Sequence, residues 1–275
     1  MKKAKVLFVF QEITPYLPDS YIANIGRHLP QGIQERGKEI RTFMPRYGNI
    51  NERRNQLHEV IRLSGMNIII DDTDHPLIIK VASIQSARLQ IYFIDNEDYF
   101  QRKYILHDKS NQFYKDNDER AVFFSRGVIE TVKKLGWAPD IIHCHGWLSS
   151  LIPFYIKKAF KDNPLFNDTK IVYSIYNDDF KEALSPDFDK KIWVDGVSEE
   201  DLAPYKNANF TSVTKAAIAH SDAVIIGHEK VNPEIIEHLK TFDRPLLQYQ
   251  SSDEYIDNYS DLYDEVMEME TMLSE

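Results

Sequence analysis

Two histidines separated by one residue stand where a buried strand is expected to end. An apolar run over 140–144 follows Pro139, which is typical of a strand in a parallel sheet, and the chain continues as His143-Cys144-His145-Gly146-Trp147. Ligands of open α/β sheets bind just beyond the carboxyl ends of the strands. Two imidazoles and an indole at such a position are suited to a polar, sugar-sized partner.

The same imidazoles could also ligate a metal ion together with Cys144. Side chains alternate along a strand, so Cys144 points away from the face that carries His143 and His145. No third ligand stands in register with them, and we therefore expect no metal site. His145 is either a hydrogen-bonding group in a ligand cleft or a buried structural residue, and the sequence leaves both open.

An acidic pair follows another expected strand, predicted near residues 170–175. Acid pairs in catalysis flank a bond from opposite sides of a cleft, which neighbours in sequence rarely do. Asp178 and Asp179 are therefore interpreted as part of a solvated loop. Four aromatic residues could either stack on sugar rings or fill the core: Tyr16, Trp147, Tyr176 and Trp193.

The apolar pattern predicts an α/β fold, Rossmann-like, with a doubly wound and mostly parallel sheet that would position these groups. An apolar run over 5–10, a helical face over 21–33 and a second run over 40–44 form a strand–helix–strand unit. Helical and strand patterns alternate again from residue 119 to residue 239. Short β-rich runs over about 57–95 predict an insertion at the sheet edge, within one domain of residues 1–250.

Residues 251–275 have a pattern of their own. They hold nine acidic residues and no lysine or arginine, and so carry most of the formal net charge of -10. Apolar residues recur every three or four positions, which predicts an acidic amphipathic C-terminal helix. The apolar stripe can pack on its own domain or be offered to a second chain. It consists of Tyr255, Tyr259, Leu262, Val266, Met269 and Leu273.

Composition excludes several classes of protein. Outside the tail the charges nearly balance, without the basic face of a nucleic-acid-binding protein, and no apolar run approaches a membrane span. A single cysteine and the lack of a signal-peptide pattern favour a cytoplasmic protein. The 10 glycines never cluster as a nucleotide-phosphate loop requires, so no nucleotide cofactor is expected.

Several stretches together resemble the N-terminal half of bacterial glycogen synthases and plant starch synthases, retaining glucosyltransferases of the GT-B architecture. Residues 5–12 are similar to the family's opening strand and its glutamate, and residues 44–48 read MPRYG, as in the family. Residues 139–147 are similar to the family pattern PD-apolar-apolar-H-x-H-D-W. Residues 172–177 and 215–216 are similar to its V-H-N and K-A-G motifs.

The resemblance implies a function and a site. Members of the family transfer glucose from a nucleotide sugar to the non-reducing end of an α-1,4-glucan, and their N-terminal domain mostly holds the acceptor. The C-terminal domain holds most of the nucleotide. A sugar-binding cleft is therefore expected to include Glu12, Tyr16, His145, Trp147, Tyr176, Asn177 and Lys215.

The chain departs from the family at three places that carry chemistry. The K-x-G-G loop falls on Pro18-Asp19-Ser20-Tyr21. A lysine there would neutralise the leaving diphosphate, and glycines would let backbone N–H groups approach phosphate oxygens. Proline, aspartate and tyrosine do neither. In addition, Tyr176 replaces the histidine of V-H-N, and Gly146 replaces the aspartate of H-D-W.

These departures, with only a short stretch where the family has its second domain, favour a non-catalytic protein of glucan metabolism. Such a protein would bind an α-glucan or maltooligosaccharide, or would bind and regulate an intact glycosyltransferase. Two alternatives stay open. The chain could be one part of a split or oligomeric α-1,4-glucan synthase that the acidic helix helps to assemble, or it could be a plain interaction module.

Overall fold

The computed structural model describes residues 3–251 and 254–269. Its central strands are runs of apolar residues that are buried along nearly their whole length, as in β7 (Ile141–His145) and β9 (Ala223–Ile226). Strands of this kind are covered on both faces by helices, which is why they show no alternation of apolar and polar residues.

Within the described residues the strands form one sheet in the order β10-β9-β8-β7-β1-β2-β6-β5-β3, and β4 pairs with β5. Neighbours are parallel from β10 to β6, and antiparallel where β5 meets β6, β3 and β4. This confirms the predicted mostly parallel α/β sheet. The remaining strands are β1 (Lys5–Phe10), β2 (Glu39–Pro45), β3 (His58–Glu59), β4 (Met66–Ile70), β5 (Thr73–Ile84), β6 (Leu89–Asp95), β8 (Lys170–Ile175) and β10 (Leu246–Leu247).

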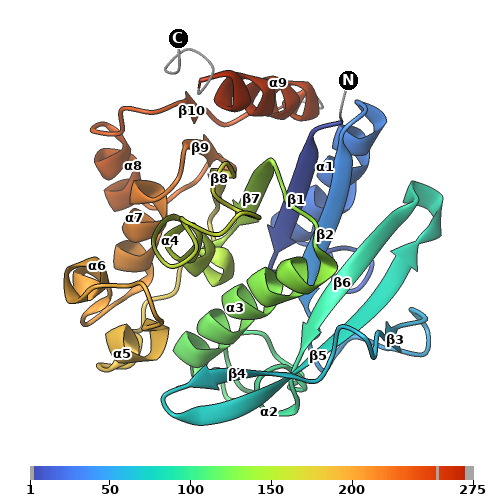
Figure 1. The fold of residues 1–275 in the computed structure, drawn as a ribbon, viewed down its shortest axis with the longest axis vertical. Coiled ribbons are helices and arrows are strands. Elements are labelled where there is room, and N and C mark those ends of the chain that lie inside the picture. The colour runs from blue at the N-terminus through green and yellow to red at the C-terminus, as the bar shows by residue number, and fades with distance from the viewer. Residues whose placement is uncertain (1–2, 252–253, 270–275) are drawn as a thin grey trace.

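Helices cover the sheet on both faces (Figure 1). α3 packs against α4, and α4 packs against α7, while α1 and α9 lie together on the other face. No helix of the described part of the chain is both long and apolar enough to cross a bilayer. The helices are α1 (Tyr21–Glu35), α2 (Glu97–Phe100), α3 (Asn117–Leu135), α4 (Leu151–Lys158), α5 (Phe188–Ile192), α6 (Glu199–Leu202), α7 (Phe210–Ala219), α8 (Pro233–Leu239) and α9 (Tyr255–Glu268), with 3-10 turns η1 (Gln85–Ala87), η2 (Trp147–Ser149) and η3 (Ala203–Tyr205).

The β-rich stretch over 57–95 is less separate from the sheet than an insertion would be. β3, β4 and β5 form the antiparallel edge, but β6 pairs in parallel with β2 and so continues the main sheet. Its apolar residues are buried like those of the central strands. The edge addition therefore ends before Leu89.

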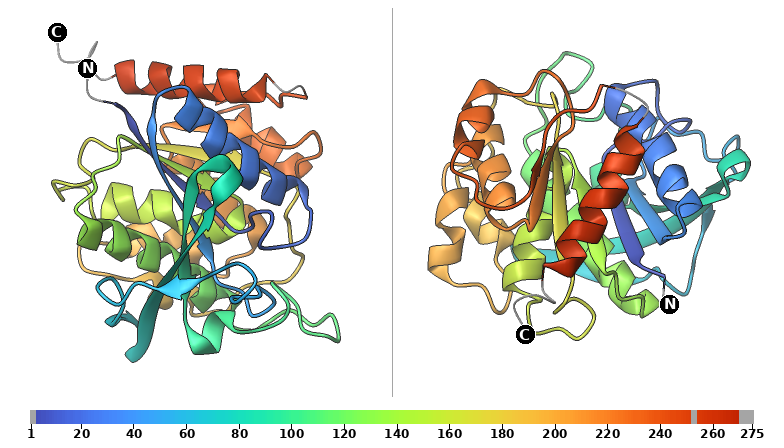
Figure 2. Two further views of the ribbon diagram at one scale, coloured as in Figure 1. Left: turned by 90° about the vertical axis from the view of Figure 1, so that its right-hand side faces the viewer. Right: turned by 90° about the horizontal axis from the view of Figure 1, so that it is seen from above.

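The acidic C-terminal helix α9 packs on its own domain, across the sheet and beside α1 (Figure 2). Gly32 of α1 permits this close approach, because a β-carbon there would lie 2.7 Å from Ile256 Cγ2. The acidic face pairs with bases of the same chain. Arg36 lies 2.6 Å from Asp257, and Lys38 lies 3.0 Å from Asp264.

Of the two alternatives that the sequence leaves open for the apolar stripe of the tail, the structure shows packing on its own domain. Tyr259, Leu262 and Val266 are buried against the rest of the chain, so they are not available to a partner. Met269 is exposed, and Leu273 lies outside the described residues. The stripe is apolar because it covers the chain's own sheet.

Candidate functional site

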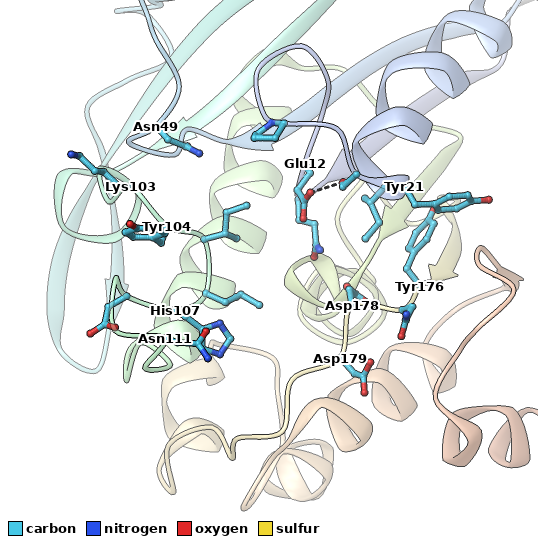
Figure 3. Close-up of a pocket in the computed structure, with 18 of the residues that line it drawn as sticks. Glu12, Tyr21, Asn49, Lys103, Tyr104, His107, Asn111, Tyr176, Asp178 and Asp179 are labelled. Atoms are coloured by element: carbon cyan, nitrogen blue, oxygen red, sulfur yellow. Dashed lines mark hydrogen bonds between the residues drawn. The ribbon is translucent and has the colours of Figure 1, made fainter.

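A pocket of about 770 Å³ opens where β1 and β8 end. Its lining comes from the loop before α1 and the first residues of that helix, from the loop of residues 103–111, and from the turn of residues 176–179 (Figure 3). The chain winds outward in both directions from the adjacent strands β1 and β7. Open α/β sheets bind ligands beside such a switch point, so the position of the pocket is that of a ligand site.

Glu12 is held at the pocket by the residue that begins α1. The hydroxyl of Ser20 donates a hydrogen bond of 2.7 Å to Glu12 Oε2, and Ser20 Oγ accepts one of 3.0 Å from the N–H of Ala23. Ser20 is thus the N-cap of α1 as well as the partner of the carboxylate. One carboxylate oxygen of Glu12 is fixed, which orients the group in the pocket.

Asp178 is a half-buried carboxylate in the turn after β8. Its Oδ2 accepts a hydrogen bond of 2.8 Å from the backbone N–H of Trp147. Burial raises its pKa to about 6, and the negative charges of Glu12 and Asp179 act in the same direction. The group therefore changes its charge close to physiological pH, unlike an ordinary surface aspartate.

Aromatic rings form the part of the pocket wall next to α1. Tyr21 is 39% exposed, and its ring lies 6.2 Å from that of Tyr176 and 4.9 Å, edge-on, from that of His228. Tyr176 itself is buried. Gly227 makes room for its ring, because a β-carbon there would lie 2.7 Å from Tyr176 Cε1. Tyr21 is therefore the accessible aromatic face of this wall.

The two histidines of the strand end lie behind this wall and away from solvent. Both are fully buried, with ring centroids 3.8 Å apart, and His145 also stacks on Phe10 at 3.8 Å. His143 lies 2.6 Å from the hydroxyl of Tyr263 in α9, and His145 lies 2.7 Å from the hydroxyl of Tyr176. We call the two neighbouring rings of His143 and His145 the imidazole layer.

Burial sets the charge of the imidazole layer. It lowers the pKa of both histidines well below the usual value of 6.5, and the neighbouring His143 lowers that of His145 further. Both rings are therefore neutral in the folded protein at neutral pH. His145 Nε2 is buried without a hydrogen-bond partner among residues 3–251 and 254–269, which is costly for a polar atom.

The structure divides the expected cleft residues into two groups. Glu12, Tyr176 and Asn177 line the pocket. The others do not, and each has a structural environment that explains why. His145 belongs to the imidazole layer, Tyr16 is buried edge-on against Phe93, Trp147 is buried against Phe180, and Lys215 on α7 pairs with Glu234 of α8 at 2.6 Å.

The positions that depart from the family pattern are also divided. Pro18, Ser20 and Tyr21 line the pocket, at the start of α1. Gly146 is not part of the lining, and its backbone has φ +79° and ψ 175°, a conformation that favours glycine.

Among the described residues, no group of three or more histidine, cysteine or acidic side chains is placed to hold a metal ion.

Sequence reasoning missed part of the lining. Asp178 was expected in a solvated loop, and the loop over 103–111, which supplies Lys103, Tyr104 and His107, carried no signal. The available clue for Asp178 was its place, three residues after the end of a buried strand. The loop over 103–111 could not be recognised as part of the pocket, because its residues form no regular helix or strand and reach the pocket only through the tertiary fold.

The sequence is similar to those of glycogen and starch synthases. The family model described as starch synthase catalytic domain matches residues 5–247. The glycogen synthase of Chlorobium luteolum is 36% identical over 234 residues, which cover 84% of this chain and 48% of that protein. The glycogen synthase of Chlorobium limicola is 41% identical over 174 residues, which cover 63% of this chain and 36% of that protein.

A solved structure extends the likeness to the fold. The catalytic domain of starch synthase IV from Arabidopsis thaliana, bound to ADP and acarbose, has a TM-score of 0.72 at 16% identity, over 90% of this chain and 51% of that one. The predicted similarity to a GT-B starch synthase fold is thereby confirmed. The chain spans about a third to a half of the length of the curated relatives named here. Because the family model covers most of its residues, the chain belongs to the starch synthase catalytic domain family.

Proposed function

We propose that this chain binds an α-glucan or maltooligosaccharide in the pocket and does not itself transfer glucose. The observation that carries the proposal is the lining, which includes the carboxylates of Glu12 and Asp178 together with the aromatic residue Tyr21 (Figure 3). Carboxylates accept hydrogen bonds from sugar hydroxyls, and an aromatic face stacks on the apolar side of a pyranose ring. Membership of a family that includes glycogen synthases supports a glucan as the ligand.

The same lining opposes a nucleotide diphosphate. Anions bind at helix N-termini through free backbone N–H groups. At the start of α1, Pro18 has no N–H to offer, Ser20 Oγ already occupies the N–H of Ala23, and the carboxylate of Glu12 lies beside them. Lys103 could attract a phosphate, but it lies across the pocket from α1 and so does not offset the repulsion at the start of that helix (Figure 3). A neutral polyol meets none of the repulsion that phosphates would meet here.

Isothermal titration calorimetry with maltoheptaose tests the proposal. We expect saturable binding at one site per chain, no binding of ADP-glucose or UDP-glucose, and no transfer of radiolabelled glucose to glycogen. Glu12→Gln should weaken maltoheptaose binding about tenfold, which corresponds to ~1.4 kcal/mol. The glutamine can still accept the hydrogen bond from Ser20, so the fold is retained.

Trp193→Ala is the matched control. Trp193 is 53% exposed and lies in a different hollow, beside Phe160 and Lys206. Its removal should leave maltoheptaose affinity unchanged if the ligand occupies the pocket near Glu12. Absence of binding at millimolar maltoheptaose would overturn the proposal, and so would glucose transfer by the purified chain.

The alternative is a glucosyltransferase that a second chain completes. It is favoured by Glu12 and Asn177, two family residues that this chain keeps at the pocket. A tagged chain purified from its own cells would then carry transferase activity, and Glu12→Gln in this chain would abolish it. Activity that is indifferent to this substitution would belong to another protein and would contradict the alternative.

A further inference from the structure

The space beside Gly146 is already filled by side chains from elsewhere in the fold. A β-carbon at position 146 would lie 2.7 Å from Asp178 Oδ2 and 2.7 Å from Gln11 Oε1. Carbon and oxygen atoms that are not bonded do not approach so closely, and the backbone conformation of Gly146 also disfavours any other residue. An aspartate at this position, as in the H-D-W motif of the family, would therefore collide with another carboxylate.

The carboxylate that occupies this space reaches it from the next strand of the sheet. Asp178 follows β8, whereas position 146 follows β7, and the two strands are parallel neighbours. The N–H of Trp147 holds Asp178 Oδ2 at 2.8 Å, and Gln11 Oε1 faces the N–H of Leu148 at 3.5 Å. Asp178 lines the pocket, close to Tyr176 and Glu12 (Figure 3).

We propose that Asp178 is a sugar-binding carboxylate of the pocket, supplied from the turn after β8 in place of the carboxylate that the family carries after β7. The inference rests on the proposed function, since it names a residue that contacts the same ligand. Loss of the aspartate at 146 and gain of one at 178 then form a paired exchange, in which a carboxylate beside position 146 is kept while the strand that delivers it changes.

The exchange makes ligand binding sensitive to pH. The charged and titratable groups around Asp178 are Glu12 from the loop after β1, Asp179 beside it and the hydroxyl of Tyr173 from β8, while the N–H of Trp147 faces it from η2. Burial raises the pKa of Asp178 to about 6, the hydrogen bond from the N–H of Trp147 opposes this shift, and the charges of Glu12 and Asp179 add to it. A ligand that needs the ionised form should lose about tenfold in affinity between pH 7.5 and pH 5.

The test is a titration of Asp178→Asn with maltoheptaose at pH 7.5 and pH 5. Asparagine can accept the hydrogen bond of Trp147 but carries no charge, so the melting temperature should change little. We expect about tenfold weaker binding at pH 7.5 and no further weakening at pH 5. Asp243→Asn is the control, because Asp243 has an 89% exposed side chain outside the pocket and its loss of charge should change neither value.

The outcomes separate this inference from the proposed function. If the unaltered chain binds maltoheptaose and Glu12→Gln weakens binding, but Asp178→Asn binds normally at both pH values, the pocket is a glucan site and Asp178 is only a cap for η2. If Asp178→Asn lowers the melting temperature without changing affinity, the same conclusion follows. If the unaltered chain binds no maltoheptaose at all, both proposals are wrong.

Discussion

The pocket, at the ends of β1 and β8, and the imidazole layer, on β7, are neighbours, yet they differ in almost every physical property. The pocket is open, carries carboxylates and is lined by irregular segments. The imidazole layer is fully buried, neutral and closed by α9. Tyr176 joins them, because it lines the pocket while its hydroxyl lies 2.7 Å from His145 Nδ1.

The difference shows that a suggestive motif at a strand end need not face a ligand. Side chains alternate along β7, and the face that carries His143 and His145 is the face on which α9 packs. The carboxylates of the pocket come from turns after strands, where the backbone leaves the sheet. Residues that pack in the interior and residues that line the pocket are thus close neighbours in the same segments.

The largest predicted effect comes from a substitution in α9, the helix that covers the imidazole layer. Val266 of α9 is 1% exposed, so Val266→Asp removes an apolar contact and buries a carboxylate without a partner. We expect a loss of about 4 kcal/mol in the free energy of unfolding. Urea denaturation followed by circular dichroism measures it. Glu265→Gln, at an exposed position of the same helix, should change stability by less than about 0.5 kcal/mol.

A loss in Val266→Asp as small as that in Glu265→Gln would show that α9 contributes no packing energy to the domain. The buried face of the helix and its contacts with α1 would then be irrelevant to folding. A large loss in Val266→Asp alone would confirm that the helix is part of the core, as the close approach of Ile256 to Gly32 requires.

A smaller effect distinguishes the layer from the pocket directly. Tyr263→Phe removes the hydroxyl 2.6 Å from His143 Nδ1 and leaves a buried nitrogen unpaired. We expect a loss of about 1–3 kcal/mol in stability. Maltoheptaose affinity should stay the same, because Tyr263 does not line the pocket. A fall in affinity with unchanged stability would contradict the separation of the two regions.

A structural feature of this protein could be predicted from the sequence where neighbouring residues determine it, and could not where residues distant in the sequence do. Apolar runs such as Lys5–Phe10 determine buried strands by themselves, and family motifs locate the strand ends, so the sheet was predictable. What covers His143, in contrast, depends on Tyr263 of α9, which lies 120 residues further along the chain. The place of Asp178 depends on the absence of a side chain at Gly146, and no pattern in the sequence near Asp178 indicates this contact.

The two regions should respond to acid in opposite directions. His143 and His145 have pKa values below 6.5 in the folded state, so the unfolded chain binds more protons as pH falls below 6.5, and stability decreases. Asp178 has a pKa of about 6 in the folded state and 3.8 when unfolded, so the folded chain binds more protons between these values, and stability increases.

Each group contributes a slope of about 1.4 kcal/mol per pH unit within its own window. Asp178→Asn removes the opposing contribution and should make the loss of stability between pH 6 and pH 4 steeper than in the unaltered chain. Urea midpoints measured at intervals of half a pH unit give both slopes. Parallel curves for the two proteins would mean that the carboxylate titrates as an ordinary surface aspartate.

The smallest predicted effect concerns the accessible ring of the pocket. Tyr21 is the first residue of α1 and is 39% exposed, so Tyr21→Ala removes a stacking face while little of the core is disturbed. We expect a loss of about 1 kcal/mol in maltoheptaose binding, or about fivefold in affinity, by calorimetry. Tyr21→Phe keeps the ring and should bind normally. If both variants bind equally weakly, the hydroxyl and not the ring contacts the ligand, and the aromatic wall would then belong with the imidazole layer as structure, leaving the carboxylates alone to define the pocket.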